Sequence, residues 1–126
     1  MNKAPVFLLV ESSPFLRPVL SEWLEDVLDD SRILIAVDGE EALKLVASER
    51  PSYVLVAINP HDRTDMELIR QLRKTIPEAR IVATSWFENR WLLKDVMSAG
   101  ADGFLTKERL YSELLPLWDV PPKLSR

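Results

Sequence analysis

Polar side chains that could do chemistry stand at the ends of apolar runs in this sequence. A carboxylate at such a position can hold a hard metal ion, whereas hydroxyl and ammonium groups can contact an anion. One run, Tyr53 to Ile58, ends with Ala57 among its last residues, and alanine offers no reactive group. The positions of interest are Glu11, Ser12, Ala57 to Asn59, Ser85, Trp86 and Lys107.

Several of these residues also have a purely structural interpretation. Glu11 and Ser12 could form the turn before a helix, with the carboxylate near the helix dipole. Ser85 could be an ordinary hydroxyl at the end of a strand. Lys107 is harder to explain in this way, because a lysine at a helix start is unfavourable with the dipole. It therefore requires an acidic partner or another role.

Other kinds of site are disfavoured. The chain has no cysteine, which excludes disulfides, thiolate catalysis and cysteine-type zinc sites. His61 is the single histidine, and a lone loop histidine is usually solvated, so a zinc site is not expected. None of the three glycines lies in a GxGxxG or Walker arrangement. The "ESSP" turn could cradle an FMN phosphate as a flavodoxin does, but it is short and carries a carboxylate where the anion would sit.

The composition is that of one globular domain. With 126 residues, 47% of them apolar and 29% charged, the chain is long enough to bury a hydrophobic core. The net charge of −4 argues against nucleic acid as a direct partner, since phosphate contacts need clustered Lys and Arg. No run approaches the roughly 20 apolar residues of a membrane span, and the apolar segment after Pro5 is too short for a signal peptide. We expect a cytoplasmic protein that contacts neither nucleic acid nor a membrane directly.

Five apolar runs predict five strands that alternate with five helices. The runs are short and mostly continuous, as in strands buried on both faces of a parallel sheet. The predicted strands are 6–10, 33–37, 53–58, 81–84 and 104–105. Apolar residues at helical spacing follow each run, and the last stripe consists of Leu110, Tyr111, Leu114, Leu115 and Trp118. An α/β fold of this kind binds ligands beyond the carboxyl ends of its strands.

Capping residues predict where the helices begin and end. Ser13 and Pro14 suit the N-cap and first position of the first helix. Asp38 to Glu41 resembles a capping box, and Thr64 with Glu67 gives another capping signal. The segment from Asn89 to Ala99 is predicted to be a helix that stops at Gly100.

Three phrases resemble the receiver domain of bacterial two-component response regulators. They are "FLLVESSPFLR", "VDGEEALKLVASERPSYVLVAIN" and "SAGADGFLTK", and the match runs from about Val6 to Leu117. The resemblance implies an α/β, flavodoxin-like fold, with a doubly wound, five-stranded parallel sheet in strand order 2-1-3-4-5. It also implies a receiver-like domain at 1–118, followed by a tail or the start of a linker at 119–126. The last phrase is most similar to receivers fused to helix-turn-helix domains.

Receivers of this family phosphorylate themselves on an aspartate at the end of the third strand, with the help of a divalent metal. The resemblance matches Glu11 to the first of two acidic metal-binding positions. It matches Ser85 and Lys107 to the hydroxyl and the lysine that contact the phosphoryl group. Phe104 matches the aromatic switch on the last strand.

Essential positions of the family differ in this chain. The second acidic position is Ser12, and the phosphoacceptor position is Ala57, which has no side chain that can attack phosphorus. Trp86 stands where a small residue normally leaves room for the phosphoryl group, and Asp62, on the next loop, is not expected to replace a missing carboxylate. We therefore expect no catalytic residue, no cofactor and weak or absent Mg²⁺ binding. The degenerate site consists of Glu11, Ser12, Ala57, Ser85 and Lys107.

The missing aspartate leaves Lys107 without its usual partner. We predict that it pairs with Glu11, whose side chain is long enough to reach across the vacant space. The function that follows is not enzymatic: a signalling module that acts by phosphorylation-independent protein–protein interaction. The alternative is a phosphorylatable receiver, or a small-molecule-binding flavodoxin-like domain, that uses non-standard residues.

The partner surface follows from the same resemblance. In the family, the fourth helix, fifth strand and fifth helix form the face that dimerises or docks on a target. This region of the chain is rich in large apolar side chains, and Trp and Tyr are favoured interface anchors. We expect a protein partner or a homodimer on a surface formed by Trp86, Phe87, Trp91, Tyr111 and Trp118.

Overall fold

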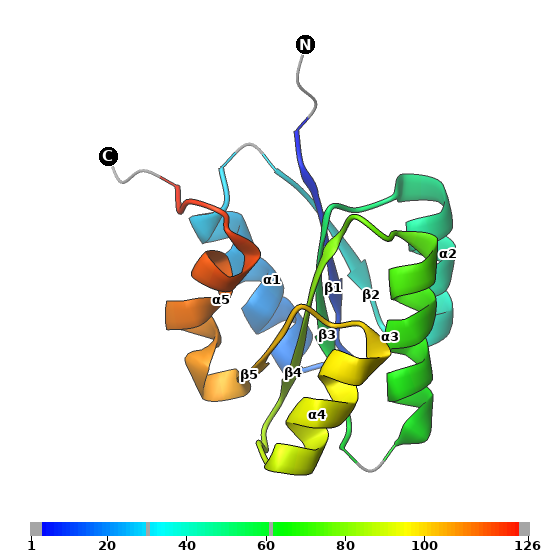
Figure 1. Cartoon of the computed structure of the whole chain (residues 1–126). Coiled ribbons are helices and arrows are strands. Elements are labelled where there is room, and N and C mark those ends of the chain that lie inside the picture. Colours follow the sequence, from blue (N-terminus) through cyan, green and yellow to red (C-terminus); the bar gives the residue numbers. More distant parts are fainter. Residues whose placement is uncertain (1–3, 30, 61, 124–126) are drawn as a thin grey trace.

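The five apolar runs form the strands of one sheet, and a helix follows each strand (Figure 1). The computed structural model describes residues 4–29, 31–60 and 62–123, so His61 lies outside the described residues. The strands are β1 (Val6–Val10), β2 (Arg32–Ala36), β3 (Tyr53–Ala57), β4 (Arg80–Ser85) and β5 (Gly103–Thr106). The helices are α1 (Leu16–Val27), α2 (Gly39–Glu49), α3 (Arg63–Thr75), α4 (Arg90–Ala99) and α5 (Leu110–Trp118), with a 3-10 helix, Lys107–Arg109, before α5.

Neighbouring strands are parallel and lie in the order β2-β1-β3-β4-β5, which confirms the predicted flavodoxin-like sheet. Val10 pairs with both Ala36 and Val56, and Ser85 pairs with Thr106. Parallel strands end at the same edge of a sheet. The residues that follow β1, β3, β4 and β5 are therefore neighbours in space.

Strand boundaries differ by a residue from the sequence prediction. β2 and β4 each begin at an arginine, because the Arg32 amide donates to the Pro5 carbonyl (3.0 Å) and the Arg80 amide donates to the Ser52 carbonyl (2.9 Å). A side chain that points out to solvent does not prevent its backbone from joining the ladder. Apolar patterning alone omits such residues.

The two faces of the sheet bury separate hydrophobic cores. Figure 1 shows α2, α3 and α4 on one face and α1 and α5 on the other. Alternate residues of one strand supply both cores: Leu8 and Val10 pack toward the first group of helices, and Phe7 and Leu9 toward the second. Burial on both sides explains why the strands are continuous apolar runs.

Trp118 belongs to the second core, so its assignment to the partner surface is wrong. Its side chain is fully buried, and the indole Nε1 donates to the Val54 carbonyl (3.2 Å). The rings of Phe7 and Tyr53 pack beside it, with centroids 5.2 and 5.8 Å away. A buried tryptophan with its N–H satisfied is an anchor of the fold. The chain continues along this end of the domain, where the Lys123 amide donates to the Val27 carbonyl (2.7 Å).

The helix starts show which capping predictions succeed. Asp38 caps α2 by accepting from the Glu41 amide (2.9 Å), as predicted. The first helix begins at Leu16, two residues later than Pro14, although Ser13 Oγ still accepts from the Leu16 amide (3.1 Å). The cap of α3 is Asp62 and not Thr64, because Asp62 accepts from the Thr64 amide (2.9 Å). Aspartate is at least as good an N-cap as threonine, and the earlier residue takes the position.

Asn89 is the N-cap of α4, accepting from the Leu92 amide (2.8 Å), and Gly100 ends that helix as predicted. Gly100 has a positive φ of 123°, a backbone conformation that favours glycine. Within the residues described, no helix has the length and apolarity needed to cross a membrane.

Candidate functional site

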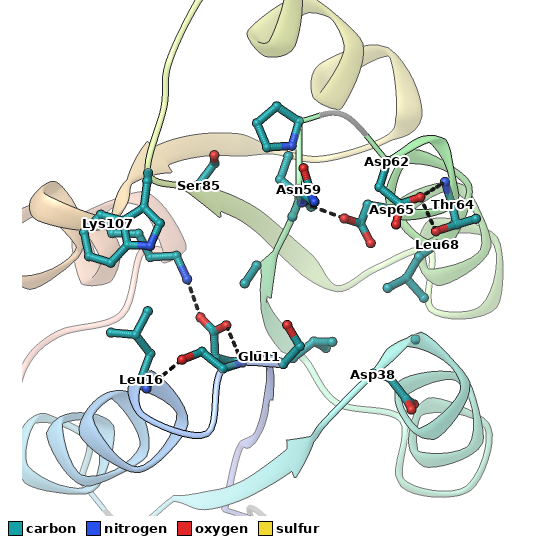
Figure 2. Close-up of a pocket in the computed structure, with 18 of the residues that line it drawn as sticks. Glu11, Leu16, Asp38, Asn59, Asp62, Thr64, Asp65, Leu68, Ser85 and Lys107 are labelled. Carbon is teal, nitrogen blue, oxygen red and sulfur yellow. Dashed lines mark hydrogen bonds and ion pairs between the residues drawn. The ribbon is translucent and has the colours of Figure 1, made fainter.

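A pocket of about 610 Å³ opens at the carboxyl edge of the sheet (Figure 2). Its walls come from the segments that follow β1, β2, β3, β4 and β5 and from the start of α3. This edge brings together every residue assigned to the degenerate site from the sequence: Glu11, Ser12, Ala57, Ser85 and Lys107. The fold therefore gathers these residues in one place.

Glu11 and Lys107 form a buried ion pair on one wall of the pocket, as the sequence predicted. Lys107 Nζ donates to Glu11 Oε1, and the side chains of Lys107 and Glu11 are only 7% and 4% exposed. The other carboxylate oxygen of Glu11 accepts from the Ser13 amide (3.1 Å). Glu11 is held in place at its backbone too, because its amide donates to the Ala36 carbonyl (3.1 Å). Both members of the pair are thus committed to partners within the chain.

Ala57 is the last residue of β3 and pairs with Thr84 of β4. Its methyl group is half-buried at the pocket wall, where the resemblance places the phosphoacceptor. A methyl group can neither attack phosphorus nor bind a metal ion.

Asp65, in the first turn of α3, is a pocket residue that the sequence analysis missed. Its Oδ2 accepts from the Asn59 amide (2.6 Å), which joins the loop after β3 to the helix. Burial raises the pKa of the Asp65 carboxyl above its ordinary value, and the nearby charge of Asp62 adds to the effect. An acidic residue three positions after a helix N-cap was the available signal, because such a residue lies on the first turn, near the sheet edge.

Asp62 serves as a helix cap. Its Oδ1 accepts from both the Thr64 hydroxyl (2.5 Å) and the Thr64 amide (2.9 Å). These hydrogen bonds lower the pKa of the Asp62 carboxyl. Since its role at the start of α3 accounts for this geometry, Asp62 is not needed as a replacement for a lost carboxylate.

Ser85 is buried, and its hydroxyl accepts from the Phe87 amide (3.2 Å). The next two residues, Trp86 and Phe87, line the pocket and are 54% and 68% exposed. The ring centroid of Trp86 lies 5.9 Å from Lys107 Nζ, within the range of a cation–π contact. Trp86 therefore borders the ion pair and also forms part of the pocket's rim.

Phe104, the predicted switch aromatic, is buried in β5 and belongs to the core on the α2–α4 side. Of the residues assigned to the partner surface, Trp91 is 72% exposed and Tyr111 is 57% exposed. Tyr111 also packs edge-on against Trp23 of α1, with ring centroids 4.8 Å apart. Four of the five predicted surface aromatics are thus exposed, and Trp118 is the exception.

The residues at the positions where this family binds its metal ion do not fit Mg²⁺ well. Mg²⁺ needs hard oxygen ligands, with one or two carboxylates that are free to bind it. Glu11 already holds Lys107, and Ser12 supplies only a neutral hydroxyl. In the described part of the chain, no three acidic or histidine side chains form a group that could hold a metal ion.

The sheet order, and a lysine after β5 that faces an acidic residue after β1, define a receiver-type α/β domain. The chain belongs to the response regulator receiver domain family, whose model matches residues 7–117. It is thus a receiver domain of two-component signalling. Domains of this family are signalling modules.

Named relatives support the same assignment. The transcriptional activator protein ExaE of Pseudomonas putida is 33% identical over 100 residues, which cover 79% of this chain and 47% of ExaE. The chemotaxis protein CheY of Halobacterium salinarum is 29% identical over 100 residues, which cover 79% of this chain and 82% of that protein. This chain therefore spans about half of ExaE but most of a CheY protein.

Solved structures share the fold. The chemotaxis protein CheY4 of Vibrio cholerae superposes with a TM-score of 0.78 at 22% sequence identity. The superposition covers 90% of this chain and 98% of CheY4. The likeness therefore extends over most of this chain.

Proposed function

We infer that this chain is an atypical receiver domain that signals through protein contacts without being phosphorylated. The observation that carries the proposal is the buried Glu11–Lys107 ion pair beside Ala57. It supplies Lys107 with a negative partner in a chain that has no carboxylate at the end of β3.

The missing nucleophile is the first step of the argument. Phosphorylation of a receiver forms an acyl phosphate, and this bond requires a carboxylate that attacks phosphorus. Ala57 cannot make it. Asp65 is joined to the Asn59 amide and Asp62 caps α3, so both neighbouring aspartates have structural roles that explain their presence.

The second step concerns the groups that would stabilise the transferred phosphoryl group. An electrophilic lysine and a divalent metal neutralise its charge in phosphoryl transfer. In this chain, Lys107 is neutralised by Glu11, and the same contact occupies the carboxylate that would bind the metal. The ion pair therefore makes both the Lys107 ammonium and the Glu11 carboxylate unavailable for phosphoryl transfer.

The third step is the partner surface. Trp86 and Phe87 directly follow β4, Trp91 lies in the first turn of α4, and all three aromatic side chains are exposed. Leu93 and Met97, which are 41% and 43% exposed, form a second apolar patch on α4, beside Pro116 and Leu117 of α5. Exposed aromatic clusters of this kind are costly in water and are typical of protein–protein interfaces. We assign this aromatic surface, Trp86, Phe87 and Trp91, to partner binding.

A binding experiment tests the proposal once a partner is in hand. Trp91→Ala should weaken the complex by about tenfold or more, since interface tryptophans are frequent hot spots. The matched control is Phe15→Ala, because Phe15 is 85% exposed but lies at the start of α1. Acetyl phosphate with Mg²⁺ should leave the affinity unchanged. A partner that binds only after phosphorylation would contradict the proposal.

A further inference from the structure

The pocket carries more negative than positive charge. Among its described lining residues are four carboxylates, those of Glu11, Asp38, Asp62 and Asp65, against the single ammonium of Lys107. The Glu11–Lys107 pair is neutral as a unit. The three aspartates remain, and they come from the starts of α2 and α3. The wall opposite the ion pair is thus acidic.

Asp65 is the member of this acidic wall that is best placed to receive a ligand. Figure 2 shows its carboxylate projecting from α3 toward the space that it shares with Glu11 and Lys107. One oxygen accepts from the Asn59 amide (2.6 Å). Burial raises the pKa of this carboxyl, because loss of water around it disfavours the charged form. A cation placed beside it would relieve that cost.

Aromatic side chains form another part of the pocket's lining. Trp86 and Phe87 line the pocket and keep more than half of their surface exposed. The Trp86 ring already lies within cation–π range of an ammonium, that of Lys107, at 5.9 Å. A planar cation that stacks on an aromatic ring while it donates to a carboxylate is a guanidinium. Arginine combines both contacts better than lysine does, because lysine's charge is compact and strongly hydrated.

We propose that this pocket receives an arginine side chain of a partner protein, with the guanidinium between the Trp86 ring and the Asp65 carboxylate. The inference rests on the proposed function and names the chemistry of the partner. The arginine enters the pocket while its apolar neighbours in the partner cover Phe87 and the rim. A separate, basic partner is favoured over a second copy, because each copy carries a net charge of −4.

Peptide titrations followed by amide NMR test the site. The probe is acetyl-Leu-Arg-Leu-amide, and its matched control replaces arginine by citrulline, which keeps the shape without the charge. The arginine peptide should shift the amide signals of Asn59, Asp65 and Trp86 in a saturable manner and bind less tightly as salt rises. The citrulline peptide should bind about tenfold more weakly, the effect of losing one charge-assisted hydrogen bond.

Variants locate the contact. Asp65→Asn should weaken binding of the arginine peptide by about tenfold, and Trp86→Ala should weaken it by about threefold to tenfold. The controls are Asp95→Asn and Phe15→Ala, which change an exposed carboxylate of α4 and an exposed aromatic at the start of α1, neither of which lines the pocket. Both controls should bind the peptide within about twofold of wild type.

Several outcomes would overturn the proposal. Equal binding of the citrulline peptide would show that the guanidinium charge does not contribute to binding. Free L-arginine that binds as tightly as the peptide would assign the pocket to a small metabolite. Self-association that Asp65→Asn abolishes would assign it to a second copy. If the arginine peptide fails to bind while a natural complex still depends on Trp91, this inference falls and the proposed function stands. If the chain accepts a phosphoryl group, the proposed function falls whatever the peptide does.

Discussion

Lys107 and Glu11 form a buried ion pair that joins the carboxyl end of β5 to the carboxyl end of β1. The two residues are 96 positions apart in the sequence, so the pair is a tertiary contact that closes one wall of the pocket. It explains how a chain with Ala57 in place of an aspartate at the end of β3 retains a buried lysine.

Breaking this pair should destabilise the fold. Glu11→Gln leaves the Lys107 ammonium buried without a carboxylate, and removing one partner of a buried pair costs about 3–5 kcal/mol. Lys107→Met should have a similar effect through the stranded carboxylate. The measurement is the free energy of unfolding from urea denaturation.

Two controls distinguish the effect of breaking the buried pair from a general sensitivity of the fold to substitution. The double variant Glu11→Gln/Lys107→Met should recover much of the loss, because no buried charge remains uncompensated. Glu67→Gln breaks the exposed Arg70–Glu67 pair and should cost at most about 1 kcal/mol. Single variants at Glu11 and Lys107 that cost no more than Glu67→Gln would contradict the assignment of a buried pair.

Substitution of the buried Trp118 should lower the free energy of unfolding much more than substitution of the exposed Trp91. Trp118→Ala removes a fully buried ring and should destabilise the protein by about 3–5 kcal/mol. Trp118→Phe keeps much of the ring but leaves the Val54 carbonyl without the indole N–H, and should cost about 1–3 kcal/mol. Trp91→Ala should change stability by about 0.5 kcal/mol or less, because that ring is 72% exposed. Equal losses at both positions would show that Trp91 packs against the fold.

Asp65 and Asp62 should titrate on opposite sides of the ordinary aspartate pKa. Burial raises the pKa of Asp65, so the stability linked to this group is present at low pH and is lost as pH rises through its folded-state pKa. The hydrogen bonds from Thr64 lower the pKa of Asp62, so its contribution is present at neutral pH and is lost as pH falls through its folded-state pKa. Carboxyl ¹³C NMR titration measures both values.

Thr64→Val is the matched test of that cause. It removes the hydroxyl that donates to Asp62 but keeps the size of the side chain. The pKa of Asp62 should rise while that of Asp65 changes little. An Asp62 pKa that stays low in the variant would show that the backbone amide alone accounts for the shift.

Much of the fold follows from the sequence, because strands buried on both faces appear as apolar runs. The runs around Leu8, Val54 and Ile81 locate three central strands, and the spacing of the helices between them implies parallel connections. The errors lie at polar boundary residues. Arg32, Arg80 and Asp62 act through their backbone or through a local cap, and apolar patterning carries no signal for these interactions.

The site was predictable to a smaller extent. The residues that gather at the sheet edge follow from the strand ends, and the Glu11–Lys107 pair follows from the missing aspartate. Trp118 shows the limit, because an apolar stripe on a helix does not tell which of its aromatics faces the core. Asp65 shows another, since its contact with Asn59 depends on how the loop after β3 turns back toward α3.

Restoring the nucleophile alone should not restore the usual chemistry. In Ala57→Asp, Lys107 is still paired with Glu11, Ser12 still replaces an acidic ligand, and Trp86 still borders the site. We expect little or no phosphorylation of this variant by acetyl phosphate. Adding Ser12→Asp and Trp86→Ala supplies a second carboxylate and more room, and should increase phosphorylation. Rapid phosphorylation of the single variant would show that the nucleophile was the only missing part.

The most direct test is to incubate the wild-type protein with acetyl phosphate and Mg²⁺ and then measure its intact mass. A phosphorylatable relative from the same family, treated in parallel, confirms that the reagent is active. The proposed function predicts an unchanged mass for this chain and a mass increase of one phosphoryl group for the relative. A phosphoryl group on this chain that survives removal of the reagent would contradict the account.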